Sequence, residues 1–149
     1  EVVEIESGRK LIEDDEEDAT ARTQPDQRSQ LPDGVEAFQI SGPLFFAVAN
    51  RLDDVLDQFA VRPQLFILRL RRVPMLDASG AQALRQFLDR ADRLGIKVFF
   101  SGLQPQPHKV LLSMHILEHS NLLLLADNFQ IAVETARDFL GQLQHRAER

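Results

Sequence analysis

From residue 35 onward, two kinds of hydrophobic pattern alternate along the chain. Short, nearly continuous apolar runs are typical of strands buried on both faces of a sheet, and Leu65–Leu70 and Leu122–Leu125 are the strongest of them. Between these runs, apolar residues recur at intervals of three and four, which is the spacing of an amphipathic helix. Strands that alternate with helices are joined by right-handed crossovers and pair in parallel. The pattern therefore predicts an α/β domain with a largely parallel sheet.

The pattern predicts about five strands and four helices. The expected strands are 2–5, 35–40, 65–70, 96–100 and 122–125. The expected helices are 45–59, 79–94, 107–117 and 128–143. Pro107 suits the first turn of its helix, and Gly95 suits the position just after a helix. Asp127 and Gln130 have the spacing of a capping box, which predicts the start of the last helix.

Length and composition limit the chemistry. At 149 residues, of which 44% are hydrophobic, the chain is expected to form one domain over residues 1–149 with a sizeable core. The absence of cysteine excludes disulfides, thiolate zinc sites, iron–sulfur clusters and a cysteine nucleophile. No apolar run is long enough to span a bilayer.

Residues 7–34 separate the first two expected strands and carry no apolar pattern. Glu13–Asp18 is a run of six carboxylates, which repel one another and bury no apolar surface. We therefore predict an acidic, flexible loop at about 7–34. Residues 1–36 carry a net charge of −8 and the rest of the chain +2. An acidic segment of this kind repels phosphates, so nucleic acid is not an expected partner.

The most distinctive local feature is Pro74–Gln82, where a buried strand leads into a helix. Ser79 and Gln82 have capping-box spacing, and Asp77 places a negative charge near the positive end of the helix dipole. Two interpretations stay open at this point. These residues cap the helix and do nothing else, or the helix N-terminus binds an anion or a partner at the carboxyl end of a parallel strand.

Other patterns give no catalytic or metal site. His115–His119 has the H-x-x-E-H pattern of an inverted zinc protease motif, but Ser120 and the strand that follows predict that the helix ends too early for both imidazoles to share one face. Phosphate-loop, dinucleotide-binding and nucleophile-elbow motifs are absent. The arginines at positions 69, 71 and 72 are interpreted as solubilising surface charges. We expect no catalytic residue, no metal and no cofactor, and hence no enzyme.

The segment Val73–Gly80 resembles the D-x-S-G signature of the STAS domain, a family named for sulfate transporters and anti-sigma factor antagonists. The order of the elements and the 96–102 segment support the resemblance, which covers about 35–145 and the first strand. It implies an α/β, STAS-like single domain with a mixed, mostly parallel sheet, whose first strand is antiparallel to its neighbour. It also marks the candidate partner- or anion-binding residues, namely Asp77, Ala78, Ser79, Gly80 and Gly102.

Within that family, the chain is most similar to the cytoplasmic C-terminal domain of bacterial SulP anion permeases. The similarity lies in Arg71–Pro74, in the long loop between the first two strands, and in a start at Glu1 that is expected of a domain cut from a longer protein. It implies a non-catalytic regulatory domain of a sulfate-like anion transporter at the cytoplasmic face of the bacterial inner membrane. The implied partners are the transporter's own membrane domain, cytosolic regulatory proteins and a weakly bound nucleotide, with dimerisation through the parent transporter.

One position separates this interpretation from the alternative. In phospho-regulated anti-sigma antagonists, the acceptor Ser or Thr directly follows the signature Asp, and here Ala78 stands there. Ser79 aligns with the next position and does not inherit the acceptor role. The alternative is a stand-alone anti-sigma factor antagonist or stress-signalling protein that lacks the usual phospho-acceptor.

Overall fold

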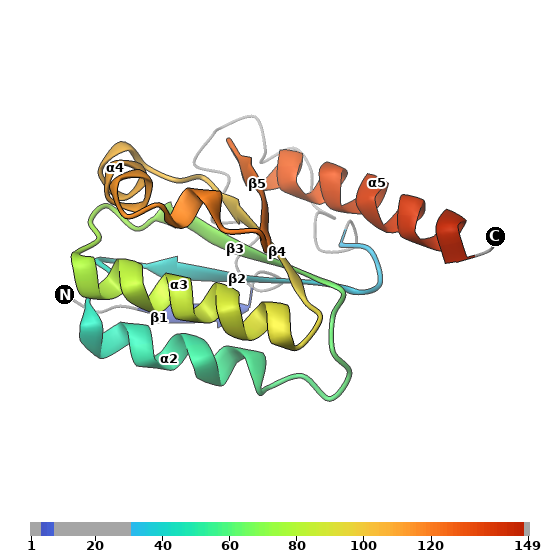
Figure 1. The fold of residues 1–149 in the computed structure, drawn as a ribbon, viewed down its shortest axis with the longest axis horizontal. Coiled ribbons are helices and arrows are strands. Elements are labelled where there is room, and N and C mark those ends of the chain that lie inside the picture. The colour runs from blue at the N-terminus through green and yellow to red at the C-terminus, as the bar shows by residue number, and fades with distance from the viewer. Residues whose placement is uncertain (1–3, 8–30, 148–149) are drawn as a thin grey trace.

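A computed structural model describes residues 4–7 and 31–147, in which strands and helices alternate from the second strand onward (Figure 1). The strands are β1 Glu4–Ser7, β2 Val35–Ser41, β3 Leu65–Arg72, β4 Lys97–Ser101 and β5 Leu122–Ala126. The helices are α2 Phe46–Leu56, α3 Ala78–Arg93, α4 Pro105–Ser113 and α5 Phe129–Ala147, with a 3-10 turn, η4, at Ile116–Glu118. Among the described helices, none combines the length and apolarity needed to cross a membrane.

The strands form one sheet in the order β1-β2-β3-β4-β5, so each strand pairs with its neighbours in sequence. Strands β2 to β5 are parallel to one another. Strand β1 pairs antiparallel with β2, and Ile5 lies opposite Ile40. The predicted α/β fold, its mostly parallel sheet and the antiparallel first strand are confirmed.

The helices cover the two faces of the sheet unequally. Helices α2, α3 and α4 lie on one face, where Phe66 stacks on Phe38 with ring centroids 5.3 Å apart and meets Phe87 of α3 edge-on at 5.4 Å. Helix α5 covers the other face and packs Phe129 and Val133 among a second set of buried residues. Because residues i and i+2 of a strand share a face, Phe66 and Leu68 belong to the first core, whereas Leu65 and Ile67 belong to the second.

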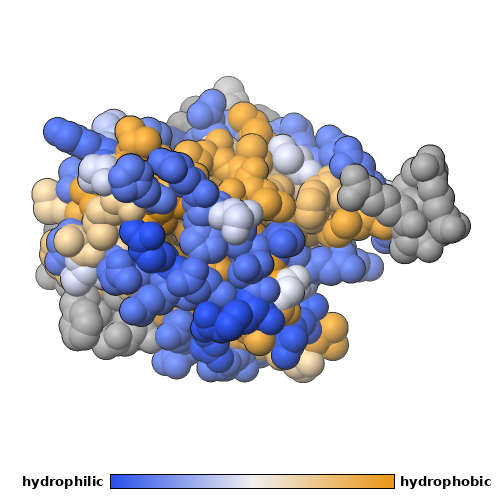
Figure 2. Space-filling model, in the orientation of Figure 1, coloured by the Kyte–Doolittle hydropathy of each residue, from blue (hydrophilic) through white to orange (hydrophobic). Residues whose placement is uncertain are grey.

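Strand β5 pairs with β4, and no other strand among the described residues pairs with its second edge. Figure 2 shows apolar residues gathered over β5, where Leu123 and Leu125 are 41% and 38% exposed. An uncharged, exposed edge strand is a surface on which another chain can pair. It lies at the far edge of the sheet from β1.

Helix ends differ from the sequence-based prediction where turn chemistry outweighs periodicity. Helix α4 begins at Pro105 and ends at Ser113, and His115 then adopts a left-handed conformation with φ of 62° that interrupts the helix before η4. The expected continuous helix over 107–117 was therefore wrong. At the last helix, Asn128 rather than Asp127 is the cap, because its Oδ1 accepts a hydrogen bond from the Ile131 N–H at 2.9 Å.

The predicted acidic loop at 7–34 lies largely outside the described residues. Ser7 belongs to β1, and of the last four residues, which are also described, Leu31 and Pro32 contact the body of the domain, whereas Asp33 and Gly34 are exposed. Leu31 is buried in the core beneath α5, and the Val35 N–H donates to the Pro32 carbonyl at 3.1 Å.

Candidate binding surface at the carboxyl edge of the sheet

Backbone hydrogen bonds join the loops that follow β2 and β3. The Gly42 N–H donates to the Arg72 carbonyl at 2.8 Å, and the Leu44 N–H donates to the Met75 carbonyl at 3.0 Å. Leu44 also forms an isolated parallel bridge with Leu76. The parallel pairing of β2 and β3 thus continues past the ends of both strands, which fixes the loop that leads into α3.

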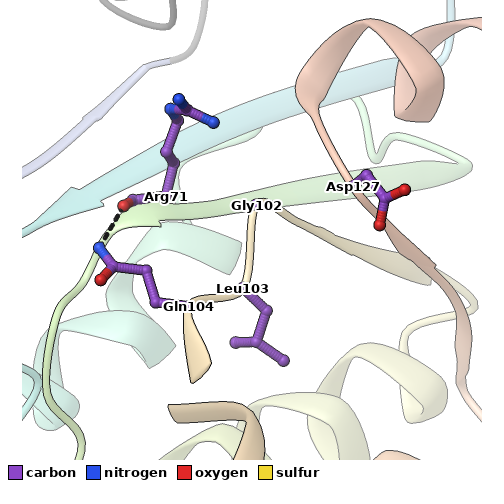
Figure 3. A pocket seen from close by; sticks show the side chains of 5 residues that line it. All are labelled: Arg71, Gly102, Leu103, Gln104 and Asp127. Atoms are coloured by element: carbon purple, nitrogen blue, oxygen red, sulfur yellow. Dashed lines mark hydrogen bonds between the residues drawn. The ribbon is translucent and has the colours of Figure 1, made fainter. Parts of the chain in front are cut away.

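Two glutamine side chains bind the segment that follows β4 to the backbone at the end of β3 and in the loop after it. Gln106 makes two hydrogen bonds to Leu76, because its Oε1 accepts from the Leu76 N–H at 2.9 Å and its Nε2 donates to the Leu76 carbonyl at 3.1 Å. Gln104 Nε2 donates to the Arg71 carbonyl at 2.7 Å (Figure 3). Sequence patterns did not single out either glutamine, since each partner lies 30 or more residues away.

Asp77, rather than Ser79, caps helix α3. Asp77 Oδ1 accepts a hydrogen bond from the Gly80 N–H at 2.7 Å and another from the Ser79 hydroxyl at 2.8 Å. These two donors favour the ionised carboxylate and hold the pKa of Asp77 below its usual value of 3.8. The predicted capping box of Ser79 and Gln82 was wrong, because the cap lies two residues earlier, at Asp77, and Gln82 Oε1 accepts from Arg85 Nε instead.

Both candidate glycines hold loops together by close contact. A Cβ on Gly80 would lie 2.1 Å from the Leu44 carbonyl oxygen and 2.9 Å from Leu76 Cδ1, so only glycine lets α3 approach the loop after β2 this closely. Gly102 has a φ of +73°, and a Cβ there would lie 2.8 Å from Arg71 Cβ. The two residues shape the site, and Gly80 itself is buried.

The surface beside the cap of α3 is partly apolar. Ala78 is exposed at the first position of the helix, and Met75 and Phe45 are 49% and 40% exposed on the two hydrogen-bonded loops. We call Phe45, Met75, Asp77, Ala78 and Ser79 the docking corner. Exposed large apolar side chains on rigid loops are characteristic of protein-binding surfaces. Neither residue was predicted as part of a site, because Phe45 falls at the start of the expected helix 45–59 and no pattern marks Met75.

A crevice opens at the carboxyl ends of β3, β4 and β5. Its volume is about 390 Å³, and it is lined by Arg71, Gly102, Leu103, Gln104 and Asp127 (Figure 3). The crevice exists because the loop after β4 leads to α4 on one face of the sheet, whereas the loop after β5 leads to α5 on the other. Adjacent loops that diverge in this way leave a gap at the carboxyl ends of the strands. Of the five sequence candidates, Gly102 lies here and the other four lie at the start of α3.

The arginine cluster is not uniformly exposed as predicted. Arg69 is fully buried, and its guanidinium carbon lies 4.1 Å from the centre of the Phe129 ring, a cation–π arrangement that ties the start of α5 to the sheet. Arg71 and Arg72, at the end of β3, are partly exposed. The prediction that all three arginines are solubilising surface charges was wrong for Arg69. Side chains alternate between the two faces of β3, and Arg69 lies on the face that α5 covers.

The two histidines of the H-x-x-E-H segment make separate contacts. His115 Nδ1 lies 3.1 Å from Glu118 Oε2, and His119 Nε2 lies 2.6 Å from Asp89 Oδ1. The left-handed residue His115 lies between α4 and η4, so the two imidazoles do not share one continuous helix. Within residues 4–7 and 31–147, no group of three or more potential ligands is placed to hold a metal ion.

Comparison with known proteins connects this geometry to one family. The model of the STAS domain family matches residues 28–133, which include the docking corner and the crevice. No curated protein is similar enough in sequence to be matched.

Solved structures extend the comparison. A sulfate transporter family protein from Wolinella succinogenes is 34% identical, with a TM-score of 0.68, over 74% of this chain and 91% of that one. The SulP transporter STAS domain from Vibrio cholerae is 29% identical, with a TM-score of 0.65, over 75% of this chain and 88% of that one. A putative anti-sigma factor antagonist from Thermotoga maritima shares the fold with a TM-score of 0.62 over 72% of this chain and 91% of that one, but only 17% identity.

Proposed function

The chain belongs to the STAS domain family, and from this premise we propose that it is the non-catalytic regulatory and interaction domain of a SulP-type anion transporter. The observation that carries the proposal is its 34% and 29% identity to two proteins described as members of sulfate transporter families, each covered almost end to end. The antagonist comparison, at 17% identity, supports the common fold alone.

The docking corner supports constitutive partner binding rather than a phosphorylation switch. Ala78, which the family resemblance aligns with the acceptor position of the antagonists, presents an exposed methyl group at the start of α3. The neighbouring Ser79 hydroxyl already donates to the Asp77 carboxylate at 2.8 Å. A phosphate on Ser79 would lie against that carboxylate, and like-charge repulsion disfavours it. Without an acceptor, the domain has no local means of releasing a partner by phosphorylation here.

The partner that best fits this corner is another protein surface. Met75 and Phe45 supply apolar contact area, and the loops that carry them are held by the hydrogen bonds of Leu44 and Gln106. Preorganised loops lose little conformational freedom on binding, which favours affinity. We propose the cytoplasmic surface of the transporter's own membrane domain as this partner, at the inner membrane of a bacterium. We also propose that cytosolic regulatory proteins bind the domain and that it dimerises through the parent transporter.

Transport measured with the full-length gene product tests the proposal. Sulfate uptake into proteoliposomes is compared for the wild type, Met75→Asp and Val61→Asp, the last being a control whose residue is 84% exposed in the loop that precedes β3. Burying an unpaired carboxylate at a contact centre weakens docking by about tenfold or more. We therefore expect Met75→Asp to change the rate of uptake and Val61→Asp to leave it unchanged. Equal rates for all three proteins, or no uptake by the wild type, contradict the proposal.

A further inference from the structure

Strand β5 and one side of α5 form an apolar surface that is separate from the docking corner. Four large apolar side chains there are between 36% and 41% exposed, namely Leu123 and Leu125 of β5 and Ile131 and Leu143 of α5. Figure 2 shows apolar residues over β5 and the adjoining part of α5. Exposed apolar side chains that gather on one surface mark a place where a partner binds. We propose that this partner is a second copy of the chain, whose β5 pairs antiparallel with the first across a two-fold axis.

The backbone of β5 is oriented to extend the sheet. The Ala126 carbonyl accepts a hydrogen bond from the Gly102 N–H at 3.0 Å, so the backbone polar groups of Ala126 point toward β4. Successive residues of a strand direct their N–H and carbonyl groups to opposite edges, so those of Leu125 point to the second edge. No other strand within residues 4–7 and 31–147 pairs there. An edge of this kind is a template on which another strand can pair.

A two-fold axis through Leu125 fits this edge. An antiparallel pair related by such an axis places one residue opposite its own copy, and hydrogen bonds form there when that residue turns its N–H and carbonyl outward. Leu125 meets this condition. It is also the middle of the regular part of β5, residues 124–126, because the register with β4 skips Leu123. In the resulting dimer, Leu125 lies opposite Leu125 of the second copy, and the two five-stranded sheets join into one.

The charges near this edge allow a second copy to approach. Residues 120–126 include no charged side chain, so no like charges lie opposite each other in the paired segment. Asp127 lies two residues beyond the axis, so the Asp127 residues of the two copies are separated by about 13 Å along the strands. That distance exceeds the Debye length of about 8 Å at physiological ionic strength, so their repulsion is screened. A charged partner strand would find no counter-charge in this segment, whereas a second copy brings the same uncharged segment.

Helix α5 adds apolar surface beside the strand. Ile131, Thr135, Phe139 and Leu143 recur at intervals of four, so they form one ridge along the helix. Phe139 meets Phe99 of β4 with ring centroids 6.5 Å apart, which places this ridge over the side of the sheet that ends in β5. Thr135 Oγ1 donates to the Ile131 carbonyl at 2.8 Å, so its hydroxyl needs no partner outside the helix. In the dimer, the two α5 helices lie on the same face of the joined sheet and flank the new strand pair.

Sedimentation velocity of the purified chain tests the dimer. The paired segment is short, so we expect a small interface, below about 600 Å² a copy, and hence a weak and reversible dimer. The sedimentation coefficient of the wild type should rise toward that of a dimer over about a hundredfold range of concentration. Leu125→Lys replaces an apolar contact with two like charges at the axis, so it should weaken association by about tenfold or more. Val61→Lys, in the loop that precedes β3, is the control and should associate as the wild type does.

Crosslinking identifies the contact within the dimer. The chain has no cysteine, so a variant with one introduced cysteine carries a single reactive thiol. A short bismaleimide should link two copies of Leu125→Cys efficiently, and it should link few copies of Val61→Cys or of Met75→Cys, the last of which lies at the docking corner.

Three results would each overturn the proposed dimer. They are a wild type that sediments as a monomer at every concentration, a Leu125→Lys variant that associates as strongly as the wild type, and crosslinking of Met75→Cys that exceeds that of Leu125→Cys. None of these measurements involves transport, so the dimer does not rest on the proposed function, and a monomeric chain would leave that function standing.

Discussion

Replacing Gly80 with alanine tests whether the packing of α3 against the loop after β2 holds the docking corner together. In the folded domain, the new Cβ would lie 2.1 Å from the Leu44 carbonyl oxygen. One of the two must move by about 0.9 Å to reach even 3.0 Å, the shortest separation that real Cβ atoms show. The Leu44 N–H is bonded to the Met75 carbonyl, so the loop cannot shift alone.

The expected loss of stability is the balance of opposing effects. Alanine is favoured over glycine inside a helix by up to about 1 kcal/mol. Forced overpacking costs about 1–3 kcal/mol, and a strained loop hydrogen bond adds about 1 kcal/mol. We therefore expect Gly80→Ala to lower the free energy of unfolding by about 2 kcal/mol, which lowers the Tm of a chain of this size by about 6 °C.

Gly141→Ala is the matched control. Gly141 lies in α5, and a Cβ there would meet no atom within 4 Å. Alanine should therefore stabilise the domain by about 0.5–1 kcal/mol through helix propensity. Urea unfolding of the wild type and the two variants gives the three free energies. The reasoning is refuted if Gly80→Ala is as stable as the wild type, since the close approach to Leu44 would then not constrain the loop.

Further stability changes separate the roles of the other site residues. Gly102→Ala places alanine at a φ of +73° and 2.8 Å from Arg71 Cβ, so it should cost about 2 kcal/mol in urea unfolding. Asp77→Ala removes the cap of α3 and should cost about 1 kcal/mol at neutral pH. Because the pKa of Asp77 is lowered by folding, the stability that its charge contributes is present well above pH 3.8. That stability is lost as the pH falls through the lowered pKa of the folded state. The free energies of unfolding of the wild type and Asp77→Ala should therefore become equal in acid. Ser79→Ala removes an exposed hydroxyl that donates to Asp77 and should cost less than about 0.5 kcal/mol, and a cost equal to that of Asp77→Ala would show that Ser79 is the cap.

The order of elements was predictable because it depends on local periodicity. Residues 65–70 read as a buried strand and form most of β3, and Gly95 ends α3 with a φ of +77°, as its position suggested. The antiparallel pairing of β1 came from the family resemblance, since no local signal encodes which way an edge strand runs. Caps were less predictable, because Asp77 and Ser79 both suit an N-cap and only the path of the backbone selects one.

The candidate site was predictable only in part because its contacts are long-range. The signature residues Asp77–Gly80 are adjacent in sequence and were found together. The contact of Gly80 with Leu44 and the two hydrogen bonds of Gln106 to Leu76 span 30 or more residues, so no spacing rule in one sequence reveals them. Arg69 was misjudged for a similar reason, since its burial depends on the position of Phe129.

The central claim, that the docking corner contacts the membrane domain of a transporter, is tested most directly by site-specific photocrosslinking. A benzophenone amino acid replaces Met75 in the full-length gene product in native membranes, and Val61 serves as the control position because it is exposed away from the corner. Mass spectrometry then maps the adducts. The account predicts adducts from position 75 on the cytoplasm-facing surface of the membrane domain of the same gene product, or on a partner subunit's copy of it, and few from position 61. Equal adducts at both positions, or none from position 75, contradict it.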